Sequence, residues 1–499
     1  MRNTFFFYDL ETSGLNPRFD RIMQFAGQRT DMDLNPIGEP VNLLVKMTDD
    51  TLPSPEALMV TGITPQQTLQ DGISEAEFSR MFLNEIATAG TIMTGYNSVR
   101  FDDEFMRHFL WRNFRDPYEW SWAETRSRWD LLDVVRLVRA LRPDGIKWPI
   151  IEKDGKKIAT NTLESLAREN DFENKNAHDA LADVEALIGV AKLLKKEQPK
   201  VFDYLLNLRN KKEVMKLANL DDPQSLVYAS GRYSAEFEKT TVVLPIAPSS
   251  KPNAVLVWDL RYLPADFENL TKDEILAKIT ADYETRIAKD FAPLPVKELC
   301  YNKCPAVAPL GTLDDTAQKR LKLDIKQIEN NFNSLRKNRG LIDKISTAWN
   351  DKPEFTPVKD IEGRLYDSFT PDADKARIRA VAAADTETLA DFNPNFVDER
   401  LPELLFRYKA RNFPKSLSQD EIGTWEKWRG EKLNKELPDF VKKLAWLDAI
   451  LHNETPKNLS KNDQKKFFAL KNWIPIKENA EFLLQEMQLW AESIMPIED

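Results

Sequence analysis

TFFFYDLET, residues 4–12, is an aromatic run followed by two acids, Asp9 and Glu11. Residues 4–8 predict a β-strand, and residues two apart on a strand point to the same face, so Asp9 and Glu11 project together. Two adjacent carboxylates repel each other unless a cation neutralises them, and Mg²⁺ and Mn²⁺ prefer oxygen ligands. Taken alone, the Asp-x-Glu pattern fits two solvated acids at the end of a surface strand better than a metal site.

The first 200 residues predict an α/β domain around this strand. Turns rich in Gly, Asn and Pro at residues 13–17 and 35–38 separate the first three predicted strands, which favours an antiparallel meander. Further strands are expected at residues 22–30, 41–47 and 91–96, and helices at 102–111, 130–141, from 161 onward and at 178–196. This order predicts a mixed sheet flanked by helices.

A chain of 499 residues is too long for one ordinary core, so two to four domains are expected. Charged, proline-containing segments at residues 195–200 and 352–357 are candidate boundaries, which predicts domains at 1–198, 199–352 and 357–499. The middle domain reads as a smaller α+β unit, with strands at 225–228, 240–244 and 254–259 and helices at 273–290 and 316–332. The last domain reads as all-helical, with helices at 372–383, 402–411, 419–432, 438–451 and 478–494.

The composition is that of a folded, soluble protein with a formal net charge of −10. This acidity disfavours nucleic-acid binding over the whole surface but allows a local basic groove. The chain has no run of about 18 apolar residues that could span a membrane, and its first residues make a poor signal peptide. We therefore expect a cytoplasmic protein without a membrane partner. Cys300 and Cys304 lack a second pair of ligands, which favours two reduced thiols over half of a zinc site.

Two further segments carry candidate chemistry. The segment Asn97-Ser98-Val99-Arg100-Phe101-Asp102-Asp103 places acids between a strand and a helix, where the helix dipole alone would favour them. His178-Asp179-Ala180-Leu181-Ala182-Asp183 opens an amphipathic helix, and Asp183 lies beside core-facing positions, where an acid needs a basic partner or a metal. His178 could act as a general base, because its ordinary pKa is near neutral; a surface histidine is the alternative.

The order of these segments resembles the DEDDh group of 3′–5′ exonucleases, which share a ribonuclease-H-like fold. The resemblance implies that Asp9, Glu11, Asp102 and Asp183 bind two Mg²⁺ ions, for which Mn²⁺ can substitute, and that His178 is the general base. Asp103 is an alternative to Asp102, but the acid directly after Phe101 matches the pattern better.

Other stretches resemble the bacterial exonuclease I family over nearly the whole chain. They are residues 118–122 (YEWSW), 127–133 (SRWDLLD), 140–146 (ALRPDGI), 302–305 (NKCP) and 408–414 (YKARNFP). The resemblance implies an SH3-like second domain, a helical third domain and processive 3′–5′ degradation of single-stranded DNA to 5′-mononucleotides in DNA repair and recombination. The alternatives are a DEDDh exoribonuclease acting on RNA 3′ ends and a non-catalytic scaffold that binds single strands.

Several residues are candidates for binding partners. Aromatic and charged residues alternate at residues 111–115 and 118–122, and core packing is the default interpretation of these aromatic side chains. Basic clusters occur at residues 209–212 and 336–339, and a solvated charged face is their default interpretation. The sharper hypothesis for both is that they line a groove that binds single-stranded nucleic acid. The family resemblance implies recruitment by the acidic C-terminal tail of single-stranded-DNA-binding protein, with Arg142 and Tyr204 as candidate contacts. We expect a monomer whose later domains enclose one strand.

Overall fold

The strand predicted from the aromatic run is the centre of a mixed five-stranded sheet. The computed structural model describes residues 3–153, 155–172, 180–288, 290–353, 358–457 and 459–496. β1 (Thr4–Thr12) pairs antiparallel with β2 (Ile22–Thr30) and parallel with β4 (Thr91–Gly95). β3 (Val41–Leu44) and β5 (Ser127–Asp130) are the edges of the order β3-β2-β1-β4-β5. The predicted mixed sheet is therefore confirmed.

Side chains of β1 alternate between two separate hydrophobic cores. Phe5 and Phe7 pack on one face with residues of α5 (Leu131–Leu141) and α7 (Ala180–Glu197). Phe6, Tyr8 and Leu10 pack on the other face with α3 (Glu75–Met81), η1 (Phe82–Ile86) and α4 (Asp102–Arg112). Because the alternation continues along the strand, Asp9 and Glu11 follow Phe5 and Phe7 onto the face that α7 covers.

One predicted strand of the first domain is shorter in the structure, and the helices between residues 55 and 86 and one hairpin were not predicted. β3 ends at Leu44 rather than at residue 47, because Lys46 N donates to Ile73 O at 2.9 Å and the chain leaves the edge of β2. The hairpin of β6 (Ile150–Lys153) and β7 (Lys156–Ala159) was not predicted, although Asp-Gly between two short β-like runs is a hairpin signal. The remaining elements are α1 (Pro55–Thr61), α2 (Pro65–Asp71), η2 (Ser98–Arg100), η3 (Glu119–Ser121) and α6 (Leu163–Glu169).

The second domain is an antiparallel sheet surrounded by helices, as the α+β prediction requires. Its strand order is β11-β10-β9-β8-β12, with β8 (Leu226–Ala229), β9 (Thr240–Pro248), β10 (Ala254–Asp259), β11 (Val296–Cys300) and β12 (Ala306–Pro309). Its other elements are α8 (Pro199–Asn207), α9 (Lys211–Leu217), η4 (Ala235–Phe237), η5 (Pro264–Asp266), α10 (Lys272–Thr280), α11 (Tyr283–Ile287), η6 (Leu310–Thr312), α12 (Asp315–Arg320), α13 (Ile325–Lys337) and α14 (Arg339–Asn350).

Two single helices predicted in the second domain are each divided. The stretch 273–290 contains α10 and α11, because Asp282 accepts a hydrogen bond from Thr285 N at 2.8 Å and starts a new helix. The stretch 316–332 contains α12 and part of α13, because Lys322 adopts a positive φ of 53° and Asp324 caps α13.

The third domain is helical, as predicted, but it contains one long helix where two were expected. α18 (Gln419–Leu451) runs through Pro438 for 33 residues. Proline removes one backbone hydrogen bond, and the helix continues because Leu433 and Phe440 on either side of it are buried in a core shared with α1 and α20 (Ala480–Ile494). The other elements are η7 (Ile361–Arg364), α15 (Asp372–Ala383), α16 (Thr386–Asp391), α17 (Leu401–Asn412), η8 (Pro414–Ser416) and α19 (Lys461–Trp473).

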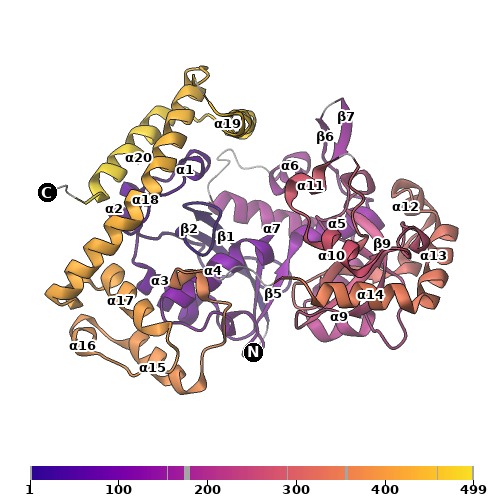
Figure 1. Cartoon of the computed structure of the whole chain (residues 1–499), viewed down its shortest axis with the longest axis horizontal. Helices are drawn as coiled ribbons and strands as arrows, with labels where there is room; N and C mark the ends of the chain where they lie inside the picture. The colour runs from indigo at the N-terminus through magenta and orange to yellow at the C-terminus, as the bar shows by residue number, and fades with distance from the viewer. Residues whose placement is uncertain are drawn as a thin grey trace.

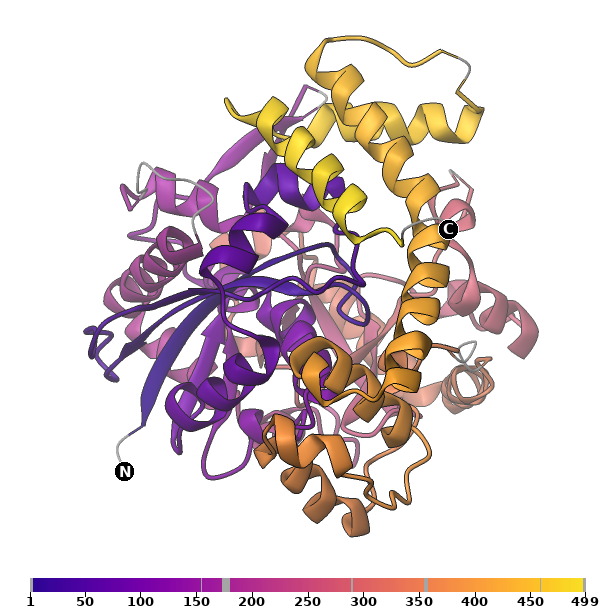
Figure 2. The same ribbon diagram turned by 90° about the vertical axis from the view of Figure 1, so that its left-hand side faces the viewer.

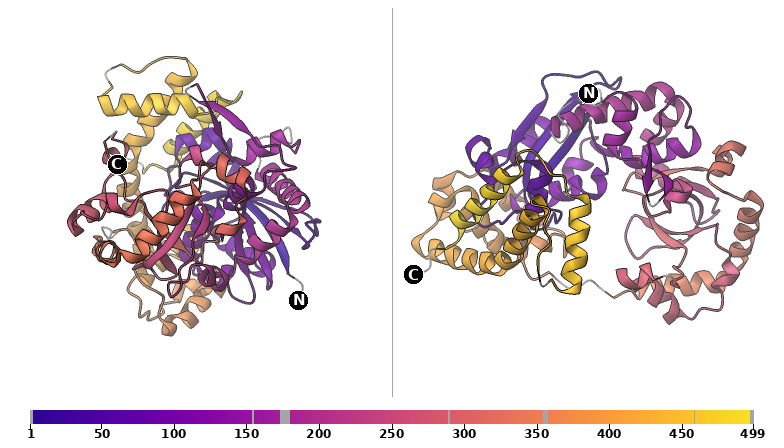
Figure 3. Two further views of the ribbon diagram at one scale, coloured as in Figure 1. Left: turned by 90° about the vertical axis from the view of Figure 1, so that its right-hand side faces the viewer. Right: turned by 90° about the horizontal axis from the view of Figure 1, so that it is seen from above.

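The first domain lies between the other two (Figure 1). α18 and α20 run beside its sheet (Figure 2), and in the view from above the second and third domains extend from it toward the same side, which gives an arch (Figure 3). No helix in the described part of the chain is long and apolar enough to cross a membrane.

A buried network of charges joins the first domain to the third. Arg21 donates to Glu362 at 2.8 Å, and Arg411 contacts Glu362 at 2.6 Å and Asp50 at 2.8 Å. All four side chains are at most 3% exposed. Burial would raise the pKa of Glu362, but Arg21, Arg411 and Arg407 hold that pKa well below its ordinary value. The network therefore depends on charged Glu362.

Replacing Glu362 with Gln should destabilise the protein by about 3–5 kcal/mol, because the buried guanidinium groups of Arg21 and Arg411 lose their shared counter-charge. Chemical denaturation measures this. The matched control is Glu403→Gln, since Glu403 pairs with Arg407 of the same network but is half exposed and should matter by less than about 1 kcal/mol. Equal stability of the two variants would contradict the assignment.

His108 makes the interface between α4 and η7 sensitive to acid. Its ring is buried, with Nδ1 3.3 Å from Glu362 O, and burial lowers its pKa to about 4. In the unfolded chain it takes a proton near pH 6.5, so the folded state loses stability as the pH falls from about 6.5 to about 4, by about 3 kcal/mol.

The variant His108→Asn, which keeps an N–H donor but does not titrate, should lose less stability than the wild type over that pH range. Denaturation midpoints measured between about pH 4 and 7.5 test this difference. Parallel curves for the two proteins would show that His108 does not titrate as described.

Candidate active site

Three carboxylates meet where the C-terminal end of β1 faces the first turn of α7. Ligand oxygens of Asp9, Glu11 and Asp183 all lie within 4.8 Å of one another, and no other His, Cys, Asp or Glu cluster of this kind occurs in the described part of the chain. Asp9 and Glu11 come from alternate positions on β1, on the face covered by α7. α7 brings Asp183 to them because its apolar stripe packs on that face.

Asp102 adds a fourth carboxylate from a neighbouring strand. β4 runs parallel to β1, so the C-terminal ends of the two strands lie at the same edge of the sheet. The chain continues from β4 through η2 into α4, whose first residue is the buried Asp102. The Asp102 charge acts on Asp9, and the backbone N–H of Leu10 favours the charged form of Asp102.

The four carboxylates disfavour one another's charge. Burial is the first cause that raises the pKa of Asp9 well above its ordinary value, followed by the charges of Asp102, Glu11 and Asp183. Burial, and then the charge of Asp103, likewise raises the pKa of Asp102. A cluster of oxygen donors with this repulsion has the chemistry that a hard divalent cation relieves. Asp9, Glu11, Asp102 and Asp183 therefore fit a divalent metal centre.

Asp103, the alternative to Asp102, is committed to a different network. It accepts hydrogen bonds from Tyr8 Oη at 2.5 Å and from Arg128 Nη1 at 2.5 Å. Both oxygens of Asp103 are thus held away from the carboxylate cluster, whereas Asp102 interacts with Asp9. His178, the predicted general base, lies outside the described residues.

Sequence reasoning missed Asp130, which positions the segment ahead of Asp102. Asp130 is the N-cap of α5 and accepts hydrogen bonds from the backbone N–H groups of Asn97 at 2.9 Å, Val99 at 3.3 Å and Leu132 at 3.0 Å. Burial, and then the charge of Asp133, raises its pKa to about 6. An acid between a strand and an apolar helix was the available signal for this cap.

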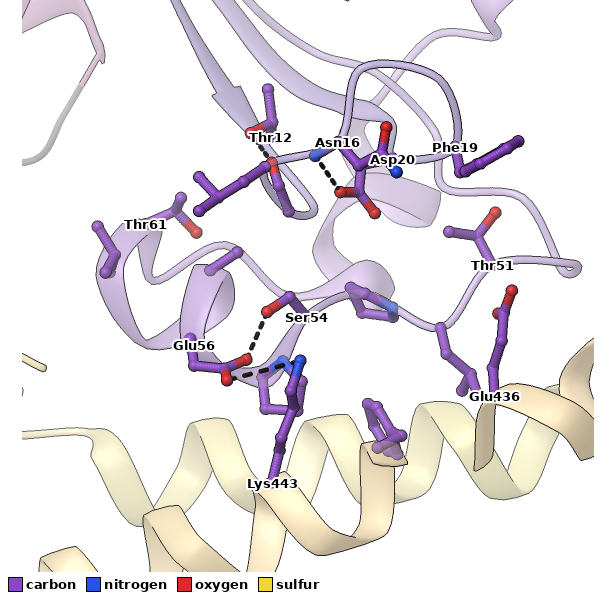
Figure 4. Close-up of a pocket in the computed structure, with 18 of the residues that line it drawn as sticks. Thr12, Asn16, Phe19, Asp20, Thr51, Ser54, Glu56, Thr61, Glu436 and Lys443 are labelled. Atoms are coloured by element: carbon purple, nitrogen blue, oxygen red, sulfur yellow. Dashed lines mark hydrogen bonds and ion pairs between the residues drawn. The ribbon is translucent and has the colours of Figure 1, made fainter. Parts of the chain in front are cut away.

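A cleft of about 1090 Å³ lies beside Glu11, between the first and third domains. Figure 4 shows the turn that carries Thr12, Asn16 and Asp20 on one side and α18, with Glu436 and Lys443, on the other. Leu15, on the turn, is 82% exposed, and Trp473 of the third domain also lines the cleft. Residues of α18 could not be assigned to this cleft from sequence, because they are about 400 positions away.

The interleaved aromatic segments divide between core and surface. Trp111, Phe114 and Trp120 are buried, which confirms the core interpretation for them, whereas Trp122 is 64% exposed. Trp122 lines a second depression, of about 920 Å³, together with Arg209 and Lys211 from the first basic cluster. The other basic cluster, at residues 336–339, does not line it; Arg336 is 3.9 Å from Asp222 instead.

Of the two candidate partner-binding residues, Arg142 lies where the first and second domains meet, and Tyr204 lies on α8 of the second domain. Arg142 Nη1 donates to Thr312 O at 3.0 Å and is 3.7 Å from Asp314. Tyr204 Oη donates to Val307 O at 3.1 Å. Their role in binding a protein tail stays a prediction. Cys304 is buried and donates to Arg128 O, and burial raises the pKa of its thiol to about 12, so it behaves as an unreactive thiol.

The mixed sheet and the acidic cluster at the ends of β1 and β4 define a nuclease of the ribonuclease-H-like class. A family model described as "Exonuclease" matches residues 6–191, and two others, "Exonuclease I SH3-like domain" and "Exonuclease I C-terminal domain", match residues 209–351 and 359–475. The chain belongs to the exonuclease I family.

Relatives match along the whole chain. Exodeoxyribonuclease I of Haemophilus influenzae is 40% identical over 473 residues, which are 94% of this chain and 98% of the relative. The crystal structure of Escherichia coli exonuclease I in complex with a dA16 oligonucleotide has a TM-score of 0.88, with 36% identity over 99% of this chain and 100% of that one. The zinc-bound form of the E. coli exonuclease I complex with single-stranded DNA has a TM-score of 0.87, with 36% identity and the same coverage.

If the carboxylates repel one another as described, Asp9→Asn should leave the metal-free protein at least as stable as the wild type, and up to about 2–4 °C more stable. Mg²⁺ or Mn²⁺ should raise the melting temperature of the wild type and have little effect on the variant. Thermal unfolding with metal and with EDTA measures both effects.

Asp103→Asn is the matched control for this experiment. It removes a charge next to the cluster but also weakens the bonds from Tyr8 and Arg128, so it should lower stability while keeping the response to metal. A normal metal response in Asp9→Asn would contradict the proposed ligand set.

Proposed function

We propose that this protein is a 3′–5′ exodeoxyribonuclease that degrades single-stranded DNA processively and releases 5′-mononucleotides. The observation that carries the proposal is the convergence of Asp9, Glu11 and Asp183 within 4.8 Å, with Asp102 beside them, in a chain that matches exonuclease I along all three domains. The Haemophilus influenzae relative is exodeoxyribonuclease I, and the solved complexes of Escherichia coli exonuclease I contain single-stranded DNA. The processes in which we propose that this protein acts are DNA repair and recombination.

Asp9, Glu11, Asp102 and Asp183 would hold two Mg²⁺ ions, with Mn²⁺ as a substitute. When bound, such a metal pair activates water on one side of the phosphorus and stabilises the leaving oxygen on the other. The protein's part is to fix the four carboxylates before the strand arrives. β1 supplies two of them, α7 the third, and the Asp130 cap holds the segment that leads into Asp102.

His178 is proposed as the general base that takes the proton of the attacking water. A histidine with an ordinary pKa exists in both protonation states near neutral pH, which suits it to accept a proton and release it again. The proposal for His178 rests on its position five residues before Asp183 in the family motif.

We propose that the 3′ end of the DNA strand binds in the cleft beside Glu11. One wall carries exposed Leu15 and the other carries Trp473 from the third domain, and apolar and aromatic side chains of this kind can pack against unpaired bases. Because the cleft is bounded by α18, the third domain would help to keep the strand in place between successive cuts. Enclosure of this kind is our explanation for processivity.

We further propose that the protein acts as a monomer in the bacterial cytoplasm, at the nucleoid, where its DNA substrate is found. The three domains proposed are residues 1–198, 199–352 and 357–499. The acidic C-terminal tail of single-stranded-DNA-binding protein would bind near Arg142 and Tyr204, where a half-exposed guanidinium group lies at the junction of two domains.

A time course on 5′-labelled single-stranded DNA, with matched RNA and blunt duplex, tests the function. Progressive shortening of the single-stranded DNA alone, abolished by EDTA, is the expected result. Preferential trimming of RNA would move the protein to the exoribonucleases, and binding without hydrolysis of any substrate would make it a scaffold.

Asp183→Asn should lower kcat by at least about 100-fold with little change in stability, because it removes a proposed metal ligand from the surface of α7. Glu185→Gln, an exposed change two residues along the same helix, is the matched control and should keep wild-type activity. Near-normal turnover by Asp183→Asn would refute the assignment of this residue.

A further inference from the structure

Lys477, in the segment between α19 and α20, is a cation of the third domain that lies near the end of β1. A Cβ added to Gly62, which ends α1, would be 2.9 Å from Lys477 Nζ. Thr61, the residue before Gly62, lines the cleft that also contains Glu11. Figure 4 shows Thr61 on the same side of the cleft as Thr12, the last residue of β1. The ammonium group therefore lies close to the strand end that carries Glu11.

The charge of Glu11 acts on Lys477. Burial lowers the pKa of the Lys477 ammonium group, and the negative charge of Glu11 opposes that effect. The charges with the largest effects on the pKa values of Asp9 and Asp102 are, by contrast, all negative. Lys477 is therefore a positive charge at the edge of a cluster of negative ones.

The segment around Lys477 is fixed on both sides. Ile474 and Ala480, three residues before and after it, are buried in the core that α20 shares with α1. Ile474 N donates to Leu470 O at 3.0 Å, and Ala480 N donates to Lys477 O at 3.1 Å. The packing of the third domain on α1 therefore determines where the Lys477 backbone lies, and the side chain extends from a fixed point.

Lys477 differs from two other lysines around the cleft in having no carboxylate partner of its own. Lys432 lies 3.5 Å from Asp50, and Lys443 lies 3.3 Å from Asp439. In the part of the chain that the structure describes, Lys477 forms no ion pair of this kind. Its positive charge is thus available to an anionic group that enters the cleft.

A structural role at the end of α1 is the alternative explanation for Lys477. Carbonyl groups in the last turn of a helix attract cations, and the ammonium group lies against Gly62, where α1 ends. This role predicts a small loss of stability when the charge is removed. It predicts no change in the binding of DNA or metal.

We propose that the Lys477 ammonium group binds the DNA phosphate group that is cleaved. The inference rests on the proposed function, which places the 3′ end of the strand in the cleft. Cleavage increases the negative charge on the phosphoryl oxygens, and a cation fixed beside them stabilises that charge. The third domain then contributes a side chain to the chemistry, in addition to bounding the cleft.

A comparison of charged and uncharged linkages tests this contact. The ligands are two oligothymidylates of about 8 nucleotides, one natural and one with a neutral methylphosphonate at the 3′-terminal linkage. Fluorescence anisotropy of the full-length protein in EDTA measures binding without cleavage. Lys477→Gln should weaken binding of the natural strand by about 5-fold or more and leave the methylphosphonate strand unchanged, because only the natural strand has a charge to lose contact with.

Two variants are matched controls for this measurement. Lys477→Arg keeps the positive charge and should retain the preference for the natural strand. Lys471→Gln removes a lysine of α19 that donates to Asn453 Oδ1 at 2.9 Å and does not line the cleft, and it should bind both strands as the wild type does.

Metal binding gives a second readout that does not depend on DNA. Lys477 repels a cation that approaches the carboxylates, so Lys477→Gln should bind Mn²⁺ about 3-fold more tightly, whereas Lys477→Arg should bind it as the wild type does. Calorimetric titration of the DNA-free protein measures this affinity. Cleavage should change in the opposite direction, with kcat/KM of Lys477→Gln lowered at least about 10-fold in saturating Mg²⁺.

Two results would overturn the proposal while cleavage by the wild type still supported the proposed function. One is a loss of stability in Lys477→Gln with unchanged Mn²⁺ affinity and an unchanged preference for the charged linkage, which would leave only the structural role. The other is equal weakening of both strands, which would place Lys477 away from the cleaved phosphate.

A wild-type protein that cleaves nothing in Mg²⁺ would instead count against the proposed function. The binding data in EDTA would then decide on Lys477 alone. Loss of the preference for the charged linkage in Lys477→Gln would support the contact, and persistence of that preference would contradict it.

Discussion

The mutual repulsion of four carboxylates at one edge of the sheet is the constraint on which the site depends. Asp9, Glu11 and Asp183 have ligand oxygens within 4.8 Å of one another, and the charge of Asp102 acts on Asp9 from the neighbouring strand. Such a group is unfavourable in a folded protein unless a cation neutralises it. The surrounding structure keeps the carboxylates together. Alternation along β1 positions Asp9 and Glu11, the apolar stripe of α7 positions Asp183, and the Asp130 cap holds the segment that leads into Asp102.

The later domains are attached to this site through charge as well as through apolar packing. The network of Arg21, Asp50, Glu362 and Arg411 joins the first and third domains and is almost fully buried. α18 reaches from that region to the cleft beside Glu11, and its continuation through Pro438 is what brings Asp439 and Lys443 to the wall opposite the turn that holds Leu15. The third domain therefore takes a direct part in forming the cleft.

Much of this was predictable from local sequence. The aromatic run at residues 4–8 predicted the first strand, and the alternation of side chains along a strand predicted that Asp9 and Glu11 project together. The helical period of residues 178–196 predicted the helix that carries Asp183. What was not predictable depended on distant contacts. The family pattern favoured Asp102 over Asp103, but the physical reason lies in distant contacts: Tyr8 and Arg128 engage Asp103. Similarly, Pro438 indicated a helix break that packing of Leu433 and Phe440 overrides.

The central claim is that Asp9, Glu11, Asp102 and Asp183 hold the metal ions that enable strand cleavage. Anomalous diffraction from crystals grown with Mn²⁺ and a short single-stranded DNA tests it most directly. The account predicts strong manganese peaks at about 2.0–2.3 Å from oxygens of these carboxylates, with the 3′-terminal phosphate of the strand against them. Manganese bound elsewhere, with the four carboxylates bare and the strand's 3′ end distant from them, would contradict the account.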